Sequence, residues 1–583
     1  MAQRIGGVLV IGAIAAATAA TAAGLQQQLR EKRPPLQAGN PANLLRRTAR
    51  FDPDPLRRRQ ARLILASQTG TSASQRRWLL QGQGWGHQGS SHLLAPVVLK
   101  QQALAYRELG QTTLAKQRWR ELLHRFPSAP PSADALYYLG TSGSRHHRAL
   151  LQRFPAHPAA LAAAVDWHRQ QGGRTGGLHL ARWGERWPGA LPALLEACQA
   201  ETPPLNASER DLLAGAIAQQ GALAAAKACL GEQPALSQRT SERLGRAPAP
   251  EASPEQRAWE QIRHQLKERQ WSSAAQALRA QLATAQTPPL QARYRFWLGL
   301  ALAQLGQQQQ AHEAWQQLLA EHPFGYYGWR ASIRLGQSPQ PLPQPREPNG
   351  GLLPAPIAAL NQLGLHTEAW EHWRSWRGGS SPKTPQDLWR EGNLRLAVGD
   401  RWSGLAQLDA AQRQGAARGL AEQHRLEQQR HPRQYQALLQ AAARSNGVEP
   451  ELLQGVARQE SRLTATVQSA AGAVGLLQLL PSTAAELMDP DPDRQALLNP
   501  ELNAALGARY LRRMLDQHGD SAWLALAAYN AGPGATKGWI NPSLKELPEL
   551  WVEMIPYPET RLYVKKVLGN RWSYTLLANP GGT

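Results

Sequence analysis

Apolar residues recur at three- and four-residue intervals through most of the chain, which is the pattern of α-helices that bury one face. The pattern is nearly continuous from about residue 48 to residue 335. It resumes between Ala355 and Glu427 and again beyond His431. The sequence therefore predicts an all-α protein. A chain of 583 residues is too long for a single core, so two to four domains are expected.

Two segments of the first helical region are imperfect copies of one helical hairpin. Each has a first helix rich in small residues, a Leu-Gly turn, a second helix with Ala and Trp, and a closing Pro, over residues 103–127 and 298–323. These features are typical of tetratricopeptide repeats. The end of another repeat is expected at Arg153-Phe154-Pro155. Residues 48–335 are thus predicted to form an α-helical superhelix, with an irregular helical bundle as the alternative.

The remaining segments differ in composition. Residues 6–24 are uncharged and follow a basic residue, so residues 1–25 are predicted to be a signal peptide. A membrane anchor is the alternative, because 19 residues nearly span a bilayer. Export of the protein follows, with anchoring in a membrane by residues 6–24 left open. Residues 26–47 form a predicted linker, residues 336–430 a Pro-rich and helical linker domain, and residues 431–583 the last domain.

Charge is unevenly placed along the chain. The net charge is +22, yet residues 431–583 hold 14 basic and 14 acidic residues, so the excess lies in the first 430. A basic superhelix suggests an anionic partner. No nucleic-acid motif accompanies the charge, so nucleic acid is not expected. The 16 His show no metal-ligand spacing and no metal or other cofactor is expected. Cys198 and Cys229 could pair or could be two core thiols.

One helix places a carboxyl group on its apolar face. Pro450 is a favoured first helical residue, and Leu453, Val456 and Ala457 form a buried stripe. Glu460 falls next on this stripe, near the negative end of the helix dipole. Poor solvation and the dipole both raise the pKa of a carboxyl group, as a general acid requires. The alternative is a Glu460 side chain that extends to solvent.

Four short blocks follow one another from this helix to the C-terminus. They are Glu460-Ser461, Gly475-Leu476-Leu477-Gln478, Ala528-Tyr529-Asn530, and an Ile-Pro-x-x-Glu-Thr-Arg-x-Tyr run over residues 555–563. In this order and spacing they resemble the catalytic domain of the soluble lytic transglycosylases, which has a goose-type-lysozyme-like fold. Leu477 stands where many members have Met, so a changed substrate contact is expected there.

The resemblance implies a role for each matched residue. Glu460 would be the catalytic acid. Tyr529 would lie near its carboxyl group, and Asn530 would shape the turn behind. The other matched residues would contact the glycan or orient the helix end; they are Ser461, Ser469, Gln478, Glu559 and Tyr563.

The resemblance also implies a reaction. Ordinary glycosidases use two carboxyl groups, whereas the acidic residues after the helix look solvated: Glu486, Asp489, Asp491 and Asp493. In the family, one acid cleaves the bond between MurNAc and GlcNAc in peptidoglycan, and the sugar's own C6 hydroxyl closes a 1,6-anhydro ring. Membrane attachment and other cell-wall proteins bound by the superhelix are further expectations. The alternatives are a muramidase that uses water and a wall-binding scaffold without catalysis.

Overall fold

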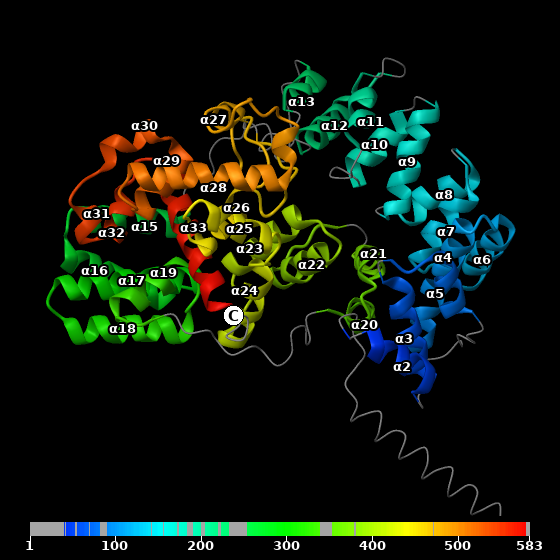
Figure 1. The fold of residues 1–583 in the computed structure, drawn as a ribbon, viewed down its shortest axis with the longest axis horizontal. Helices are drawn as coiled ribbons and strands as arrows, with labels where there is room; N and C mark the ends of the chain where they lie inside the picture. Colours follow the sequence, from blue (N-terminus) through cyan, green and yellow to red (C-terminus); the bar gives the residue numbers. More distant parts are fainter. Residues whose placement is uncertain are drawn as a thin grey trace, which may run out of the picture. The chain divides into compact units, whose positions relative to one another are not determined.

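The computed structural model describes residues 40, 42–52, 55–68, 70–81, 90–141, 143–155, 157–171, 174–183, 190–199, 204–219, 223–231, 253–338, 353–377, 380–469 and 471–578. Helices dominate these residues (Figure 1), and the only extended pairings among them are two isolated bridges, Gln468–Val474 and Val474–Leu479. The predicted all-α fold is confirmed. The predicted signal peptide or anchor lies outside the described residues. No described helix is both long enough and apolar enough to cross a bilayer.

The chain divides into two compact units, and the boundary falls within α12 (Ala207–Gln219). The first unit holds α2 (Ala42–Phe51), α3 (Pro55–Ser67), α4 (Ala73–Leu80), α5 (Ser90–Glu108), α6 (Thr112–Arg125), α7 (Pro131–Leu139), α8 (Arg145–Arg153), α9 (Pro158–Gln171), α10 (Arg174–Trp183), α11 (Ala190–Cys198), α20 (Ala355–Gln362) and α21 (His366–Trp376).

The second unit begins with α13 (Leu223–Leu230), α15 (Pro254–Lys267), α16 (Trp271–Thr284), α17 (Pro288–Gln304), α18 (Gln308–Glu321) and α19 (Gly325–Arg334). It continues with α22 (Pro385–Ala397), α23 (Arg401–Arg413), α24 (Gly419–Arg430), α25 (Gln436–Ser445), α26 (Pro450–Glu460), α27 (Pro481–Ala485), α28 (Pro500–Gln517), α29 (Ala522–Ala531), α30 (Pro533–Thr536), α31 (Ser543–Glu546), α32 (Pro548–Met554) and α33 (Pro558–Leu576), with single 3-10 turns at Ala496–Leu498 and Lys537–Trp539.

The two predicted repeats are the hairpins α5–α6 and α17–α18. Their Leu-Gly turns place Gly110 at φ 73° and Gly306 at φ 79°, a conformation that glycine adopts without steric cost. The second helix of each hairpin buries one Trp, Trp119 or Trp315. Sequence and structure therefore agree on where these repeats lie.

The units do not follow the predicted domain order. Helices α20 and α21 of the predicted linker domain belong to the first unit, while α15 to α19 of the predicted superhelix belong to the second. Helix α2 also begins inside the predicted 26–47 linker, at Ala42, because Leu45 and Ala49 give it a buried face. Composition carries no information on which helices pack together.

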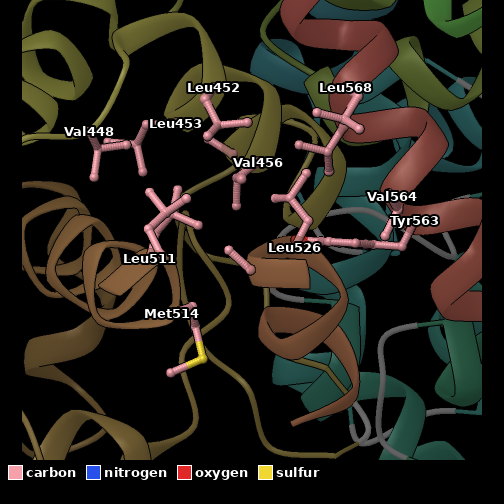
Figure 2. Packing of buried hydrophobic residues seen from close by; sticks show 14 of the residues in the cluster. Val448, Leu452, Leu453, Val456, Leu511, Met514, Leu526, Tyr563, Val564 and Leu568 are labelled. Atoms are coloured by element: carbon pink, nitrogen blue, oxygen red, sulfur yellow. The ribbon is translucent and has the colours of Figure 1, made fainter. Parts of the chain in front are cut away.

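Helix α26 packs into a large hydrophobic core of the second unit. Leu453, Val456 and Ala457, the predicted stripe, are fully buried. Figure 2 shows side chains of α26, α28, α29 and α33 meeting in this core, with Tyr563 and Val564 on the α33 side. The core also includes Tyr326 and Trp329 of α19, so it is built from segments more than a hundred residues apart.

Two glycines allow the helices around α33 to approach closely. A Cβ on Gly455 of α26 would lie 3.0 Å from the carbonyl oxygen of Val567, and one on Gly569 would lie 2.7 Å from the backbone nitrogen of Tyr326. Helix α33 therefore contacts α26 on one side and α19 on another. The Trp572 indole nitrogen donates to the Pro323 carbonyl at 2.8 Å where α33 meets α19.

Neither cysteine is a free thiol: Cys198 and Cys229 are both disulfide-bonded.

Candidate active site

Glu460 is the last residue of α26, and its carboxylate oxygen Oε1 accepts a hydrogen bond from the Tyr563 hydroxyl at 2.6 Å. Tyr563 is 4% exposed and comes from the first turns of α33. The Glu460 residue itself is partly exposed. The close packing of α26 on α33 at Gly455 brings the two side chains together.

Burial raises the pKa of the Glu460 carboxyl from its ordinary value of 4.5 to about 7. The Tyr563 hydrogen bond favours the ionised form and limits the rise, and the negative charge of Glu559 adds to it. Burial and the nearby Glu460 charge hold the pKa values of Tyr563 and Tyr529 well above 10, so both stay neutral phenols. Near neutral pH Glu460 is therefore present both protonated and ionised, which suits an acid that must later act as a base.

The chain leaves α26 through two consecutive residues in the left-handed region, Arg462 at φ 48° and Leu463 at φ 56°. Such a conformation is costly for residues with side chains and persists where neighbouring contacts fix it. Leu463 is fully buried, and the Arg462 guanidinium lies 4.2 Å from the ring centre of Trp402 in α23. The contacts of Arg462 and Leu463 thus fix the turn that directly follows Glu460.

The small-residue loop that follows is closed by Gln478. This residue has a φ of 49°, and its side-chain nitrogen Nε2 donates to the carbonyl oxygens of Val467 at 3.0 Å and Gly475 at 2.8 Å. Ser469 is exposed, and its hydroxyl oxygen accepts from the Ala473 backbone nitrogen at 3.0 Å. Gln478 therefore supports the loop through its nitrogen, while Ser469 lies at the exposed tip.

Asn503 of α28 is a residue of this site that the sequence motifs did not reveal. It is fully buried, accepts from the Leu477 backbone nitrogen at 2.7 Å and donates to the Val474 and Leu497 carbonyls. The Tyr529 hydroxyl donates to the Leu477 carbonyl at 2.9 Å. Both backbone groups of Leu477 are therefore fixed by side chains of neighbouring helices.

The expectation of a substrate contact at Leu477 is wrong. Its side chain is fully buried, and a Cβ on Gly507 of α28 would lie 2.2 Å from it. Leu477 therefore packs the loop onto α28. Gly475 is required for the same fit, since a Cβ there would lie 2.4 Å from the Asn503 amide nitrogen. The sequence of α28 carries no local signal for Asn503, since nothing in the helix itself distinguishes this residue from polar residues that face solvent.

The other matched residues differ in burial and in their hydrogen-bond partners. Ser461 is fully buried and its hydroxyl donates back to the Ala457 carbonyl at 3.1 Å. Asn530 lies inside α29, near its end, and its side-chain oxygen accepts from the Thr560 hydroxyl at 2.7 Å. Glu559 is exposed, and its charge acts on Glu460. The acidic residues of the following loop are also exposed, as predicted: Glu486, Asp489, Asp491 and Asp493.

In the first unit one group of described residues has the composition of a metal site. Asp134, His157 and Glu371 place one ligand atom each within 4.8 Å of one another. The Lys100 ammonium, however, lies 2.8 Å from Asp134 and 3.4 Å from Glu371. Burial alone would lower the pKa of Lys100, but the two carboxylates outweigh burial and raise it. Lys100 thus supplies the positive charge that a metal would bring, and the group is a buried ion-pair cluster.

Comparison with known proteins agrees with this geometry. Residues 437–551 match the family described as the transglycosylase SLT domain, and residues 101–129 and 294–324 match the tetratricopeptide repeat. A soluble lytic murein transglycosylase of Salmonella typhimurium is 30% identical over 287 residues, which cover 47% of this chain and 42% of that protein. The match to Escherichia coli soluble lytic murein transglycosylase is 29% identical with the same coverage. The chain thus aligns with less than half of these relatives.

A shorter sequence match and two matches to solved structures are also to proteins named lytic transglycosylases. Membrane-bound lytic murein transglycosylase C of Actinobacillus pleuropneumoniae is 29% identical over 24% of this chain and 46% of its own. Lytic transglycosylase Slt of Pseudomonas aeruginosa superposes over 90% of this chain and 83% of its own, at 19% identity and a TM-score of 0.41. The 70 kDa soluble lytic transglycosylase of Escherichia coli covers 91% and 94%, at 18% identity and a TM-score of 0.38.

Proposed function

We propose that this chain, whose C-terminal region carries a transglycosylase SLT domain, is a peptidoglycan lytic transglycosylase. It would cleave the β-1,4 bond between MurNAc and GlcNAc and release 1,6-anhydroMurNAc products in cell-wall remodelling or recycling. One observation carries the proposal: a single carboxyl group of raised pKa, Glu460, held by the hydroxyl of the neutral Tyr563. Every other acidic residue named for this site is exposed.

In the proposed reaction Glu460 acts first as an acid and then as a base. The protonated carboxyl gives its proton to the glycosidic oxygen, and the bond from that oxygen to C1 of MurNAc breaks. The 2-acetamido group of the same sugar stabilises the positive charge at C1. The Glu460 carboxylate then removes the proton of the C6 hydroxyl, whose oxygen bonds to C1. Glu460 ends protonated again, and no water is consumed.

The neighbouring side chains would position the acid and the sugar. Tyr563 donates to Glu460 Oε1, which leaves the other carboxyl oxygen to carry the transferred proton. Tyr529 and Asn530 would hold the wall of the site through Leu477 and Thr560. Ser461 would fix the end of α26, while Ser469, Gln478 and Glu559 would contact the glycan.

The mass of the products tests the proposal. Purified protein is incubated with peptidoglycan sacculi, and the released muropeptides are weighed. We expect products lighter than those of a muramidase by one water molecule. Hydrated reducing ends as the main products would contradict the proposal, and no products at all would favour the wall-binding scaffold.

The position of Glu559 favours the muramidase as a second candidate function. Hydrolysis of a glycosidic bond normally requires a second carboxylate beside the acid. Glu559 is a carboxylate whose charge acts on Glu460. We expect Glu559→Gln to retain turnover within about tenfold and to lower the pKa of Glu460, since one negative neighbour is removed. The decline of rate with pH should then begin at a lower pH. Turnover as low as that of a Glu460 variant would make Glu559 a second catalytic carboxylate.

Tyr563→Phe should raise the pKa of Glu460, whereas Glu559→Gln should lower it. Loss of the hydroxyl removes a hydrogen bond that favours the ionised carboxylate, so the pKa of Glu460 should rise above about 7. We expect turnover to fall by about 10- to 150-fold, because one hydrogen bond to a charged group contributes about 1.5–3 kcal/mol. The pH at which the rate declines should move upward. A pH profile unchanged from the wild type would contradict the role of Tyr563.

The location and partners of the protein are part of the proposal. The apolar segment at residues 6–24 supports export to the periplasm, where it would be cleaved or would remain as an inner-membrane anchor. Peptidoglycan glycan strands are the proposed substrate. The net charge of +22 resides before residue 431, which supports attraction of the helical repeats to the anionic wall and to other cell-wall proteins.

A further inference from the structure

Trp402 of α23 contacts the turn that directly follows Glu460. Arg462 and Leu463 of this turn both have a left-handed backbone, which is costly for residues with a side chain. Leu463 is fully buried in the core around α26. Arg462 is half-buried, and its guanidinium lies 4.2 Å from the ring centre of Trp402. The indole ring is therefore a contact that can hold Arg462 in this conformation.

The turn determines how the helix that carries Glu460 ends. The backbone nitrogens of Ser461 and Leu463 both donate to the Ala457 carbonyl, at 3.2 and 3.4 Å, so the chain folds back on the last turn of α26. Glu460 lies within the segment that these hydrogen bonds close. The chain then continues into the loop that carries Ser469. A change in the turn would therefore alter both the helix end at Glu460 and the start of this loop.

The start of α23, where Trp402 lies, is fixed by contacts of its own. Asp400 caps the helix, since its side chain accepts from the Ser403 backbone nitrogen at 3.2 Å. Leu405 and Leu408 are fully buried in a core that α23 shares with α22 and α24. The ring of Trp402 thus belongs to a helix that has its own support.

Helix α23 contacts the end of α26 at two points. Trp402 and Asp409 are seven positions apart, which is about two turns along one helix face. Asp409 accepts from the Arg458 guanidinium at 2.7 Å, and Trp402 contacts Arg462. Both contacts come from outside residues 437–551, which match the transglycosylase SLT domain.

Positive charges gather beside Arg462. Burial lowers the pKa of Lys566, the Asp409 carboxylate raises it, and three guanidinium charges lower it further. The three belong to Arg413, Arg458 and Arg462. The face of an indole ring attracts a guanidinium group, and Trp402 supplies this attraction among groups that repel Arg462.

We propose that Trp402 is a positioning residue for cleavage at Glu460: its ring holds Arg462 in the left-handed turn and so fixes the end of α26. The inference rests on the proposed function. The strain of one left-handed residue and the stabilisation by one partly buried cation–π contact are of similar size. Without the ring the turn would relax, the end of α26 would fray, and the Glu460 carboxyl would lose its fixed position.

Two substitutions of Arg462 in the full chain provide the first test. Gln and Asn both remove the guanidinium from the Trp402 ring, but Asn adopts the left-handed conformation more readily. We expect Arg462→Gln to lower kcat on peptidoglycan about tenfold and Arg462→Asn to lower it by at most about threefold. KM should stay within about twofold of the wild type for both. Equal kcat values of the two variants would overturn the proposal.

Substitution of the ring provides the second test. Trp402→Leu keeps an apolar side chain but removes the aromatic face, so we expect kcat to fall about tenfold, whereas Trp402→Phe should stay within about threefold. Tyr138→Leu is the matched control, since it removes a ring that lies 4.6 Å from the Arg107 guanidinium in the first unit. It should leave kcat unchanged. Wild-type turnover in Trp402→Leu, or an equal loss in Trp402→Phe, would contradict the role of Trp402.

Rescue separates a positioning role from a loss of packing. Trp402→Leu combined with Arg462→Asn should have a higher kcat than Trp402→Leu alone, because Asn keeps the turn without the ring. A packing role predicts no recovery, since the ring is still missing. Absence of recovery would therefore overturn the proposal. The kcat ratio of Arg462→Gln to Arg462→Asn decides this inference whichever product forms, while the product mass alone decides the proposed function.

The pH profile provides an independent readout. Burial raises the pKa of the Glu460 carboxyl to about 7, and Tyr563 and Glu559 also act on it, with the neutral phenol of Tyr529 nearby. A frayed end of α26 would admit water to this carboxyl and lower its pKa. The rate of Trp402→Leu should therefore begin to decline at a lower pH than that of the wild type. A reduced kcat with an unchanged profile would mean a loss of packing and would overturn the positioning role.

Discussion

A Glu460→Gln variant is expected to lose about 1,000-fold or more of its turnover on peptidoglycan and to keep its fold. The amide retains the shape of the carboxyl group and can still accept from the Tyr563 hydroxyl at Oε1. It has no acidic proton for the glycosidic oxygen and cannot remove one from the C6 hydroxyl. General acid–base catalysis contributes about 10²–10⁴-fold per group, and Glu460 is proposed to serve in both steps.

Release of muropeptides from sacculi at pH 6, measured for equal amounts of folded protein, checks this prediction. Glu486→Gln is the matched control, since Glu486 is an exposed carboxylate that pairs with Arg513 at 2.9 Å on the surface. It should release muropeptides at the wild-type rate. A Glu460→Gln variant with a tenth of the wild-type turnover would show that another group supplies the proton.

The same substitution should change how stability depends on pH. The pKa of Glu460 is about 7 in the folded protein and 4.5 ordinarily, so the folded state disfavours the ionised form. Wild-type stability is then complete below about pH 4.5 and falls as pH rises through about 7. Glu460→Gln removes this loss, and above pH 7 it should be more stable than the wild type by at most about 3 kcal/mol. Equal urea midpoints of the two proteins at pH 8 would contradict the raised pKa.

The course of α26 could be predicted because its signals are local. The residues at positions 453, 456 and 457 have the spacing of one helix face, and all three are buried. The hairpins α5–α6 and α17–α18 were predictable for the same reason, since Gly110 and Gly306 mark the turns within each repeat. Signals that lie within one helix or one hairpin do not depend on the rest of the fold.

The contacts of Asn503 could not be predicted in this way. In its own helix it is a polar residue like several that face solvent, and its burial depends on the loop at residues 474–477 that folds over it. The packing of α19 against α33 depends likewise on Gly569 and Trp572, about 250 residues further along the chain. Helix patterns specify the buried face of each helix and leave open which element covers it.

The domain boundary predicted at residue 431 was likewise placed from local patterns, which do not show which earlier segments pack against the last domain. Arg458, two residues before the end of α26, is 3% exposed and donates to the Arg430 carbonyl at 2.7 Å. Its guanidinium also binds Asp409 of α23 at 2.7 Å. Asp409 pairs with the Arg430 side chain as well, at 3.0 Å. The helix that carries Glu460 is therefore fixed by residues before the predicted boundary, so a chain starting at His431 would leave Arg458 without its partners.

Asp409→Asn is expected to destabilise the second unit by about 3–5 kcal/mol at pH 7, because it leaves the buried Arg458 charge without a carboxylate. Burial alone would raise the pKa of Asp409, but Arg458 and Arg430 outweigh burial and hold it well below its ordinary value of 3.8. The stabilisation from Asp409 is therefore present above about pH 4 and is lost as pH falls toward the lowered pKa. The wild-type advantage over the variant should shrink below pH 4.

Urea unfolding followed by tryptophan fluorescence measures this effect, and Asp516→Asn provides the matched control. Asp516 also pairs with an arginine, Arg512, at 2.9 Å, but its side chain is 66% exposed, whereas that of Asp409 is 19% exposed. Exposed ion pairs contribute about 0–1 kcal/mol, so Asp516→Asn should move the midpoint little. Equal shifts for the two variants would mean that Asp409 does not stabilise α26 through a buried charge.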